Sequence, residues 1–140
     1  MTGDVMNDIL LETVRKLNIS LVRGDYLLCT IHRAENVDNP GSLSQIVRAL
    51  IECGENVRFP VHPRTRKRLE EFGMLDALRS ADNVDLTEPK GYADFIRLLA
   101  GANKVITDSG GVRREAYILG KPAIIATDIT WFPGILRAGW

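Results

Sequence analysis

The chain has 140 residues, of which 45% are hydrophobic and 26% are charged, values typical of one globular domain with a single core. Because 18 basic residues balance 18 acidic ones, the chain lacks the basic excess of a nucleic-acid-binding surface. Its two cysteines are too few for a disulfide scaffold or a metal site, and Cys29 is predicted to be a buried free thiol.

The first residues do not resemble a signal peptide, and no apolar run reaches the roughly 20 residues of a membrane helix. We therefore expect a cytoplasmic protein with neither a membrane nor a nucleic acid as partner. An amphipathic helix is predicted first, over 4–17, with five apolar side chains facing the core. These side chains are Val5, Ile9, Leu10, Val14 and Leu17.

Further helices are predicted where apolar residues recur at helical spacing, over 43–53, 91–101 and 111–119. Ser42 or Ser44 is predicted to cap the first of these three. The densest basic run, HPRTRKR, is predicted to be a solvated helix start, and an anion site is the alternative.

Five short apolar runs between these segments predict β-strands. They span 26–31, 57–61, 83–87, 104–108 and 123–127. Strands that alternate with helices indicate βαβ units, so we predict one α/β domain over 1–140, a Rossmann-like, doubly wound parallel sheet. In such sheets, ligands bind beyond the carboxyl ends of the strands.

Polar or unusual residues follow four of the predicted strands, so they are expected to converge on one rim of the sheet. The segments are 30–36, 62–64, 87–92 and 107–111. Two of these segments carry further predictions about single residues. Glu35 is predicted to orient the first loop, and Asp108 is predicted to be a structural residue of the last.

The segment Ser109-Gly110-Gly111 joins the fourth predicted strand to a helix. The first N–H groups of a helix have no internal partner, and the helix dipole makes that end positive. The two glycines would let an anion approach the backbone closely and would permit unusual dihedral angles. The pattern indicates a phosphate site, with the Ser109 hydroxyl as a cap or a further donor. A capped helix after a tight turn is the alternative.

Glu115 lies one helical turn past Gly111, where its carboxylate would repel a bare phosphate but could accept hydrogen bonds from a ribose diol. The alternative is a surface glutamate that favours the helix dipole. His32 and Arg33 follow the first strand, and both can donate to a phosphate. A histidine can also titrate near neutral pH.

Together, five motifs resemble the C-terminal half of UDP-N-acetylglucosamine 2-epimerases, in that family's order and spacing. They are GDVMNDIL (3–10), TIHRAEN (30–36), HPRTRKRLEEFG (62–73), EPKGYADFIRLL (88–99) and TDSGGVRREAYILGKP (107–122). The resemblance implies a glycosyltransferase-B-type fold of two Rossmann-like domains, with this chain as the UDP-binding one. It also implies interconversion of UDP-GlcNAc and UDP-ManNAc by elimination and re-addition of UDP. No metal or organic cofactor is implied, and cell-surface polysaccharide biosynthesis is the expected setting.

By the same resemblance, the segment 109–111 and Arg33 would hold the diphosphate, and Glu115 would bind the ribose hydroxyls. His32 is the catalytic residue that the resemblance implies, placed to stabilise charge on departing UDP. The backbone of 89–92 would meet the uracil edge.

The sequence also departs from the family's usual pattern. Arg113-Arg114 stand where Gln-Glu is usual, which adds positive charge near the predicted phosphate site. In the segment 127–134, Thr127 replaces an arginine, and Trp131 and Gly134 stand where acidic residues are expected. That loop helps to shape the family's sugar site, so the changes bear on turnover.

The resemblance further implies that the family's N-terminal domain, which carries the proton-transferring carboxylates, and its C-terminal tail are absent. The sequence offers no convergent carboxylate pair in their place. We therefore expect the UDP-binding half of an epimerase, non-hydrolysing rather than hydrolysing and inactive alone. A UDP-sugar, a complementary N-terminal domain or subunit and a second copy are the expected partners. His62 is similar to a position in the allosteric substrate site of regulated bacterial members.

Three alternatives remain. One is a non-catalytic nucleotide-sugar-binding or partner-docking module, which the rewritten loop favours. The second is the C-terminal domain of a UDP-sugar glycosyltransferase, and the third is a degenerate domain that binds nothing.

Overall fold

The structure, a computed structural model, describes residues 5–127. Its centre is a parallel five-stranded sheet in the order β3-β2-β1-β4-β5. The strands are β1 (Tyr26–Thr30), β2 (Asn56–Pro60), β3 (Val84–Thr87), β4 (Lys104–Thr107) and β5 (Ala123–Ile125). The five predicted strands and the α/β class are therefore confirmed, with ends shifted by one or two residues.

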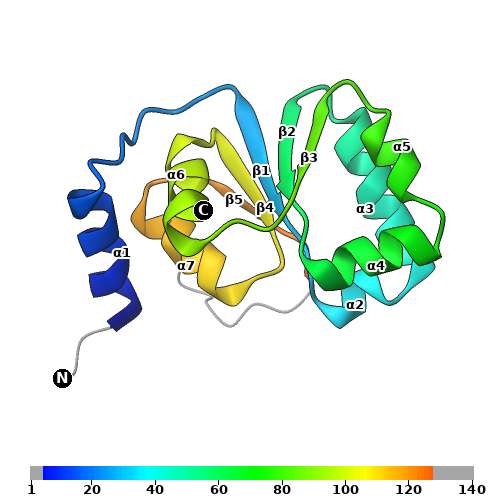
Figure 1. Ribbon diagram of the computed structural model, residues 1–140, viewed down its shortest axis with the longest axis horizontal. Helices are drawn as coiled ribbons and strands as arrows, with labels where there is room; N and C mark the ends of the chain where they lie inside the picture. Colours follow the sequence, from blue (N-terminus) through cyan, green and yellow to red (C-terminus); the bar gives the residue numbers. More distant parts are fainter. Residues whose placement is uncertain (1–4, 128–140) are drawn as a thin grey trace.

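Helices cover both faces of the sheet, as a doubly wound fold requires (Figure 1). They are α1 (Val5–Lys16), α2 (Ala34–Val37), α3 (Pro40–Glu52), α4 (Pro63–Glu71), α5 (Leu75–Arg79), α6 (Tyr92–Gly101) and α7 (Gly110–Ile118). One buried core lies under α3, α4 and α5, and a second lies under α1, α6 and α7. Between residues 5 and 127, each helix is too short or too polar to cross a bilayer.

The central strand β1 explains why the two cores are separate. Its residues Leu27 and Cys29 point into one core, and Tyr26 and Leu28 point into the other. A strand that is buried on both faces reads as a continuous apolar run, which is the pattern YLLCT. The prediction that Cys29 is a buried free thiol is confirmed.

The prediction for the first helix is wrong in its burial, although the helix itself forms. Of the five side chains expected in the core, only Leu10 is buried and Val14 is half-buried. Val5, Ile9 and Leu17 are 68%, 42% and 37% exposed. The reason is that α1 packs on the helices α6 and α7 rather than on the sheet, so only a narrow stripe of it is covered.

The start of α3 also corrects a prediction. The side chain of Asn39, rather than Ser42 or Ser44, caps this helix, because its Oδ1 accepts from the N–H groups of Gly41 at 2.8 Å and Ser42 at 3.1 Å. Pro40 occupies the first helical position, where its missing N–H costs nothing. The helix therefore begins three residues before the predicted start.

The basic run 62–68 does begin a helix, α4, as predicted, with His62 as its N-cap. Arg64 and Arg68 on this helix both form ion pairs with Asp38, which follows α2. Part of the run therefore joins two helices together.

Candidate functional site

The site lies where the order of the strands reverses, between β1 and β4. From β1 the chain proceeds to β2 on one side, whereas β4 and β5 occupy the other side. The ends of the two strands are aligned, and the hydroxyls of Thr30 and Thr107 lie 2.8 Å apart. This topological switch point is the usual ligand position in open α/β sheets.

All four predicted rim segments meet here, as the sequence analysis expected. A pocket of about 160 Å³ is lined by residues from the segments that follow β1, β2, β3 and β4. They include Thr30, His32, His62, Pro89, Lys90 and Ser109.

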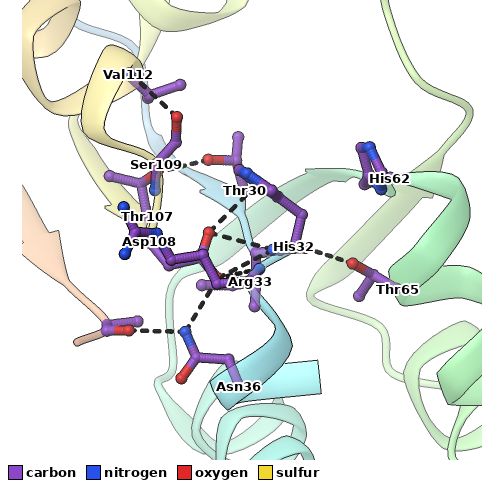
Figure 2. A network of polar contacts seen from close by, with 12 residues as sticks. Thr30, His32, Arg33, Asn36, His62, Thr65, Thr107, Asp108, Ser109 and Val112 are labelled. Carbon is purple, nitrogen blue, oxygen red and sulfur yellow. Dashed lines mark hydrogen bonds and ion pairs between the residues drawn. The ribbon is translucent and has the colours of Figure 1, made fainter. Parts of the chain in front are cut away.

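Asp108 joins the loop after β1 to the loop after β4 (Figure 2). Its carboxylate is fully buried and accepts from the backbone N–H groups of His32, at 3.0 and 3.1 Å, and Arg33, at 2.8 Å. The side-chain amide of Asn36 donates to the same carboxylate at 2.9 Å and to the carbonyl of Ala126 at 2.7 Å. Asp108 is therefore structural, as predicted, and it fixes the position of His32 and Arg33.

The helix α7 begins at this rim directly after Ser109. The Ser109 hydroxyl accepts from the N–H of Val112 at 3.4 Å, so it caps the helix. The unusual dihedral angles that these glycines would permit are not used, because neither Gly110 nor Gly111 has a positive φ.

The absence of a side chain at Gly111 nevertheless has a consequence. A Cβ atom at this exposed position would meet only the Ser109 hydroxyl, at 3.9 Å. The fold around Gly111 thus has room for a methyl group, and glycine leaves that space open. The open space lies at the positive end of a helix dipole, where an anion is favoured.

Glu115 is not the surface residue of the alternative reading, because only 8% of it is exposed. Burial raises the pKa of its carboxyl, while the Tyr92 hydrogen bond and the charge of Arg114 lower it. Tyr92 donates to Oε1 of Glu115 at 3.1 Å, and burial, with Glu115, raises the pKa of Tyr92 to about 12. The hydrogen bond between Tyr92 and Glu115 therefore connects the segment after β3 to α7.

The two histidines of the chain lie side by side in the rim pocket. Their ring centroids are 5.4 Å apart. Nδ1 of His32 lies 3.3 Å from Oδ1 of Asp108, and Nδ1 of His62 accepts from the N–H of Arg64 at 3.2 Å. His32 and His62 therefore share one site, a proximity that the sequence did not specify.

Positive charge gathers beside Asp108. The guanidinium of Arg33 pairs with the exposed carboxylate of Glu35 at 3.4 Å, which agrees with the predicted role of Glu35 in this loop. Arg113, one of the two arginines expected to add positive charge near the phosphate site, is buried. Burial first and Arg33 second lower the pKa of Arg113, and Asp108 raises it.

The rim thus offers a helix N-terminus, two imidazoles and a cation to an anion, and a buried carboxylate one turn further along. In the part of the chain from 5 to 127, no group of three or more His, Cys, Asp or Glu residues is arranged to hold a metal ion. The altered positions Trp131 and Gly134 lie outside the described residues.

The side chain of Tyr92 was not predicted to be functional, because only the backbone of its segment had a predicted role. The signal was available in part, because Tyr92 lies within the motif EPKGYADFIRLL, at the start of a helix. Its partner Glu115 is 23 residues away, and only the strand order brings the two together.

Comparisons with known proteins agree with this geometry. The family model described as UDP-N-acetylglucosamine 2-epimerase matches residues 1–139. A relative from Methanococcus maripaludis, named UDP-N-acetylglucosamine 2-epimerase homolog, is 41% identical over 99% of this chain. A Pseudomonas aeruginosa relative, named UDP-2,3-diacetamido-2,3-dideoxy-D-glucuronate 2-epimerase, is 39% identical over 98% of it.

Among solved structures, the Methanocaldococcus jannaschii UDP-GlcNAc 2-epimerase in complex with UDP-GlcNAc and UDP matches 96% of this chain. The TM-score is 0.88 and the sequence identity is 36%. This chain spans 41% of the Methanococcus relative, 39% of the Pseudomonas relative and 41% of the solved chain. It therefore corresponds to about two fifths of each.

Proposed function

The chain belongs to the UDP-N-acetylglucosamine 2-epimerase family, and we propose that its rim is the UDP half-site of such an enzyme. One observation carries this proposal. Asp108 brings His32 and Arg33 against the N-terminus of α7. Two segments that are more than 70 residues apart thereby form one anion-binding surface at a topological switch point.

Each predicted residue has a role in this proposal. The backbone of Ser109, Gly110 and Gly111 holds the diphosphate at the positive end of α7, and Arg33 adds a cation. Glu115, oriented by Tyr92, accepts hydrogen bonds from the ribose hydroxyls. The backbone of 89–92 contacts the edge of the uracil.

His32 is the proposed catalytic residue, beside the β-phosphate, where it stabilises the charge on departing UDP. In an elimination from a UDP-sugar, the carbon–oxygen bond to UDP breaks and its electrons pass to a phosphate oxygen. A donor held at that oxygen lowers the barrier. His62, across the same pocket, is proposed as a regulatory contact.

The full reaction is a proposal for a larger assembly, because this chain corresponds to about two fifths of its relatives. The whole enzyme would interconvert UDP-GlcNAc and UDP-ManNAc, non-hydrolysing and with no cofactor. Complementary residues from an N-terminal domain or subunit would supply the acid and base at the sugar. This chain alone is expected to bind UDP without turnover and to self-associate through exposed apolar surface such as that of α1.

A second candidate concerns the sugar rather than the nucleotide. The Pseudomonas relative is named as the 2-epimerase of a UDP-linked diacetamido-glucuronate and is 39% identical to this chain. A UDP half-site would serve either sugar, so the choice depends on the rest of the sugar site. UDP itself is therefore the ligand to test first.

The decisive variant is Gly111→Ala. The fold accommodates the added methyl group, since its nearest neighbour is the Ser109 hydroxyl at 3.9 Å, and alanine favours a helix over glycine by about 0.5–1 kcal/mol. Inside the proposed site, the methyl group displaces the phosphate from the helix N-terminus. A charge-assisted hydrogen bond is worth about 1.5–3 kcal/mol, so UDP affinity is expected to fall about 10- to 100-fold.

The measurement is a backbone NMR titration of the chain with UDP, in which the largest shifts are expected at His32, Gly110 and Glu115. Ser109→Ala and Glu115→Ala should also weaken binding. Ser44→Ala and Glu12→Ala, at exposed positions away from the rim, are the matched controls. Unchanged UDP affinity in a folded Gly111→Ala chain would refute the half-site.

A further inference from the structure

The two histidines of the rim pocket use their Nδ1 atoms in opposite ways. Nδ1 of His62 accepts a hydrogen bond from the backbone N–H of Arg64 at 3.2 Å. Nδ1 of His32 instead lies 3.3 Å from Oδ1 of the buried Asp108 carboxylate. A carboxylate can only accept, whereas a backbone N–H can only donate.

These partners specify the position of the proton in each neutral ring. A neutral imidazole carries one N–H, and the other nitrogen carries a lone pair. His62 needs its lone pair at Nδ1, so its N–H is at Nε2. Beside a carboxylate, the proton of His32 is favoured at Nδ1, which leaves the lone pair at Nε2.

We propose that Asp108 is a positioning residue that holds His32 in the Nδ1–H tautomer, so that His32 takes up a proton when a phosphate group binds. His62 is the opposite case, because a neutral ring with its lone pair at Nδ1 already offers an N–H at Nε2. The identity of the phosphate as the diphosphate of UDP rests on the function proposed above. The assignment of the two tautomers does not.

The consequence follows from electrostatics. A neutral His32 presents a lone pair to the pocket, and a lone pair repels a phosphate oxygen. One proton from solvent converts the ring to an imidazolium, in which both nitrogens donate. Asp108 then faces a positive ring at Nδ1, and the phosphate faces Nε2.

Other charged groups surround this ring, and each has a definite sign. Asp108 from the loop after β4 favours the imidazolium. Lys90, from the segment after β3, lines the same pocket, and its positive charge disfavours the imidazolium. Arg33, which follows His32 in the loop after β1, has the same effect. Arg113 on α7 acts on Asp108 and Arg33, and His62 lies 5.4 Å away. A bound phosphate adds negative charge to this set and so favours proton uptake.

The contacts of Asp108 also predict how an asparagine would sit in its place. Oδ2 accepts from three donors, the N–H groups of His32 and Arg33 and the amide of Asn36. The oxygen of asparagine is therefore held at the Oδ2 position. Its NH₂ group then takes the Oδ1 position and faces Nδ1 of His32. That donor requires a lone pair at Nδ1, so Asp108→Asn reverses the tautomer.

The first test is the ¹⁵N shift of the imidazole nitrogens in the whole chain at about pH 8.5, without ligand. At that pH an ordinary imidazole, whose pKa is about 6.5, is neutral. The chain has only two histidines, and His62→Gln assigns their signals. Protonated Nδ1 in His32 and protonated Nε2 in His62 are expected. Asp108→Asn should move the His32 proton to Nε2 and leave His62 unchanged.

Asn36→Ala is the matched control, because it removes a donor to Asp108 but keeps the carboxylate beside the ring. It should leave the tautomer as it is. A protonated Nε2 of His32 in the unsubstituted chain would overturn the proposal, even if Asp108→Asn fails to fold. A tautomer that persists in a folded Asp108→Asn chain would overturn it as well.

The second test is calorimetry of UDP binding in two buffers that differ in ionisation enthalpy. Close to one proton is expected to be taken up per UDP at about pH 8, and the dissociation constant should rise up to about tenfold from pH 7.5 to about 8.5. In Asp108→Asn, the rise should be less than about twofold. Binding without proton uptake overturns the coupling, whereas failure of UDP to bind overturns the proposed function. The ring nitrogens still decide the tautomer in that case.

Discussion

The Glu115→Gln substitution removes a charge that the fold buries and that the proposed ribose site uses. Burial is the largest influence on the Glu115 carboxyl and raises its pKa, despite the opposing effects of Tyr92 and Arg114. The ionised form is therefore disfavoured in the folded chain. A glutamine keeps an oxygen for the Tyr92 hydroxyl, so the hydrogen bond survives in its weaker, neutral form.

The sign of the stability change follows from the raised pKa. The contribution of Glu115 to stability is fully present below its unfolded pKa of about 4.3 and is lost as the pH rises through the higher folded pKa. Glu115→Gln has no such loss. We expect the variant to be more stable than the unsubstituted chain at about pH 7.5, by about 1 kcal/mol or less. The two should be equal at about pH 4.

The effect on binding has the opposite sign. A carboxylate accepts hydrogen bonds from both hydroxyls of a ribose, and a hydrogen bond to a charged acceptor is worth about 0.5–2 kcal/mol more than one to a neutral acceptor. UDP affinity should therefore fall about 10- to 100-fold. The Glu115 carboxylate is thus expected to improve UDP binding and to lower the stability of the free chain.

Urea unfolding at the two pH values and UDP titration at about pH 7.5 measure both effects. Glu70→Gln, at an exposed position on α4, is the matched control. A variant that is less stable at about pH 7.5 would contradict the argument from burial. Undiminished UDP affinity would contradict the ribose role of Glu115.

Three further predictions concern packing and burial, one at the rim and two away from it. Thr65→Val should lower the free energy of unfolding by about 1–3 kcal/mol, because the buried Thr65 hydroxyl donates at 2.5 Å to the carbonyl that precedes His32; a loss below about 0.5 kcal/mol in urea unfolding would contradict this. Gly101→Ala should cost about 1–3 kcal/mol, since its Cβ would lie 2.7 Å from the Tyr26 hydroxyl. In a Tyr26→Phe background the nearest remaining ring atom is 3.6 Å away, so the same change should cost nothing, and additive losses in a double-mutant cycle would argue otherwise. A thiol reagent should modify the exposed Cys53 rapidly and reach Cys29 only in denaturant, because Cys29 is inaccessible and burial raises its pKa; two fast thiols would refute this.

The strands were located more accurately than the burial of the outer helix was. A strand buried on both faces, such as β1, is a plain apolar run, and its predicted and observed ends differ by one residue. The outer helix α1 was predicted to bury too much, because periodicity reports that a helix has an apolar side and not how much of it is covered. Leu10 and Ile9 are adjacent apolar residues of similar size, yet Leu10 is buried and Ile9 is 42% exposed.

The short helices α2 and α5 were missed for a related reason. With four and five residues, they hold too few apolar positions for a helical period to be visible. The cap of α3 was misplaced because several residues with capping side chains occur close together. Asn39 is the cap because Pro40, which follows it, is favoured at the first position of a helix.

In the candidate site, the sequence could identify the residue types and the strand ends that carry them. It could not determine the pairs, which depend on the order of the strands. Tyr92 with Glu115 and His32 with His62 are neighbours only because β3, β2, β1 and β4 lie in that order. The same holds for Arg113, whose burial near Asp108 the sequence did not indicate.

Some rim residues are needed by the fold, and others are needed only by the proposed ligand. Asp108 holds two backbone N–H groups and a side-chain amide, so its loss damages the fold before it reaches any ligand. Gly111 makes no such contact, and its missing side chain leaves a space that the fold does not require. A loss of UDP affinity in Gly111→Ala therefore reports on the ligand alone. For Asp108→Asn, only the tautomer of His32 separates positioning from damage to the fold.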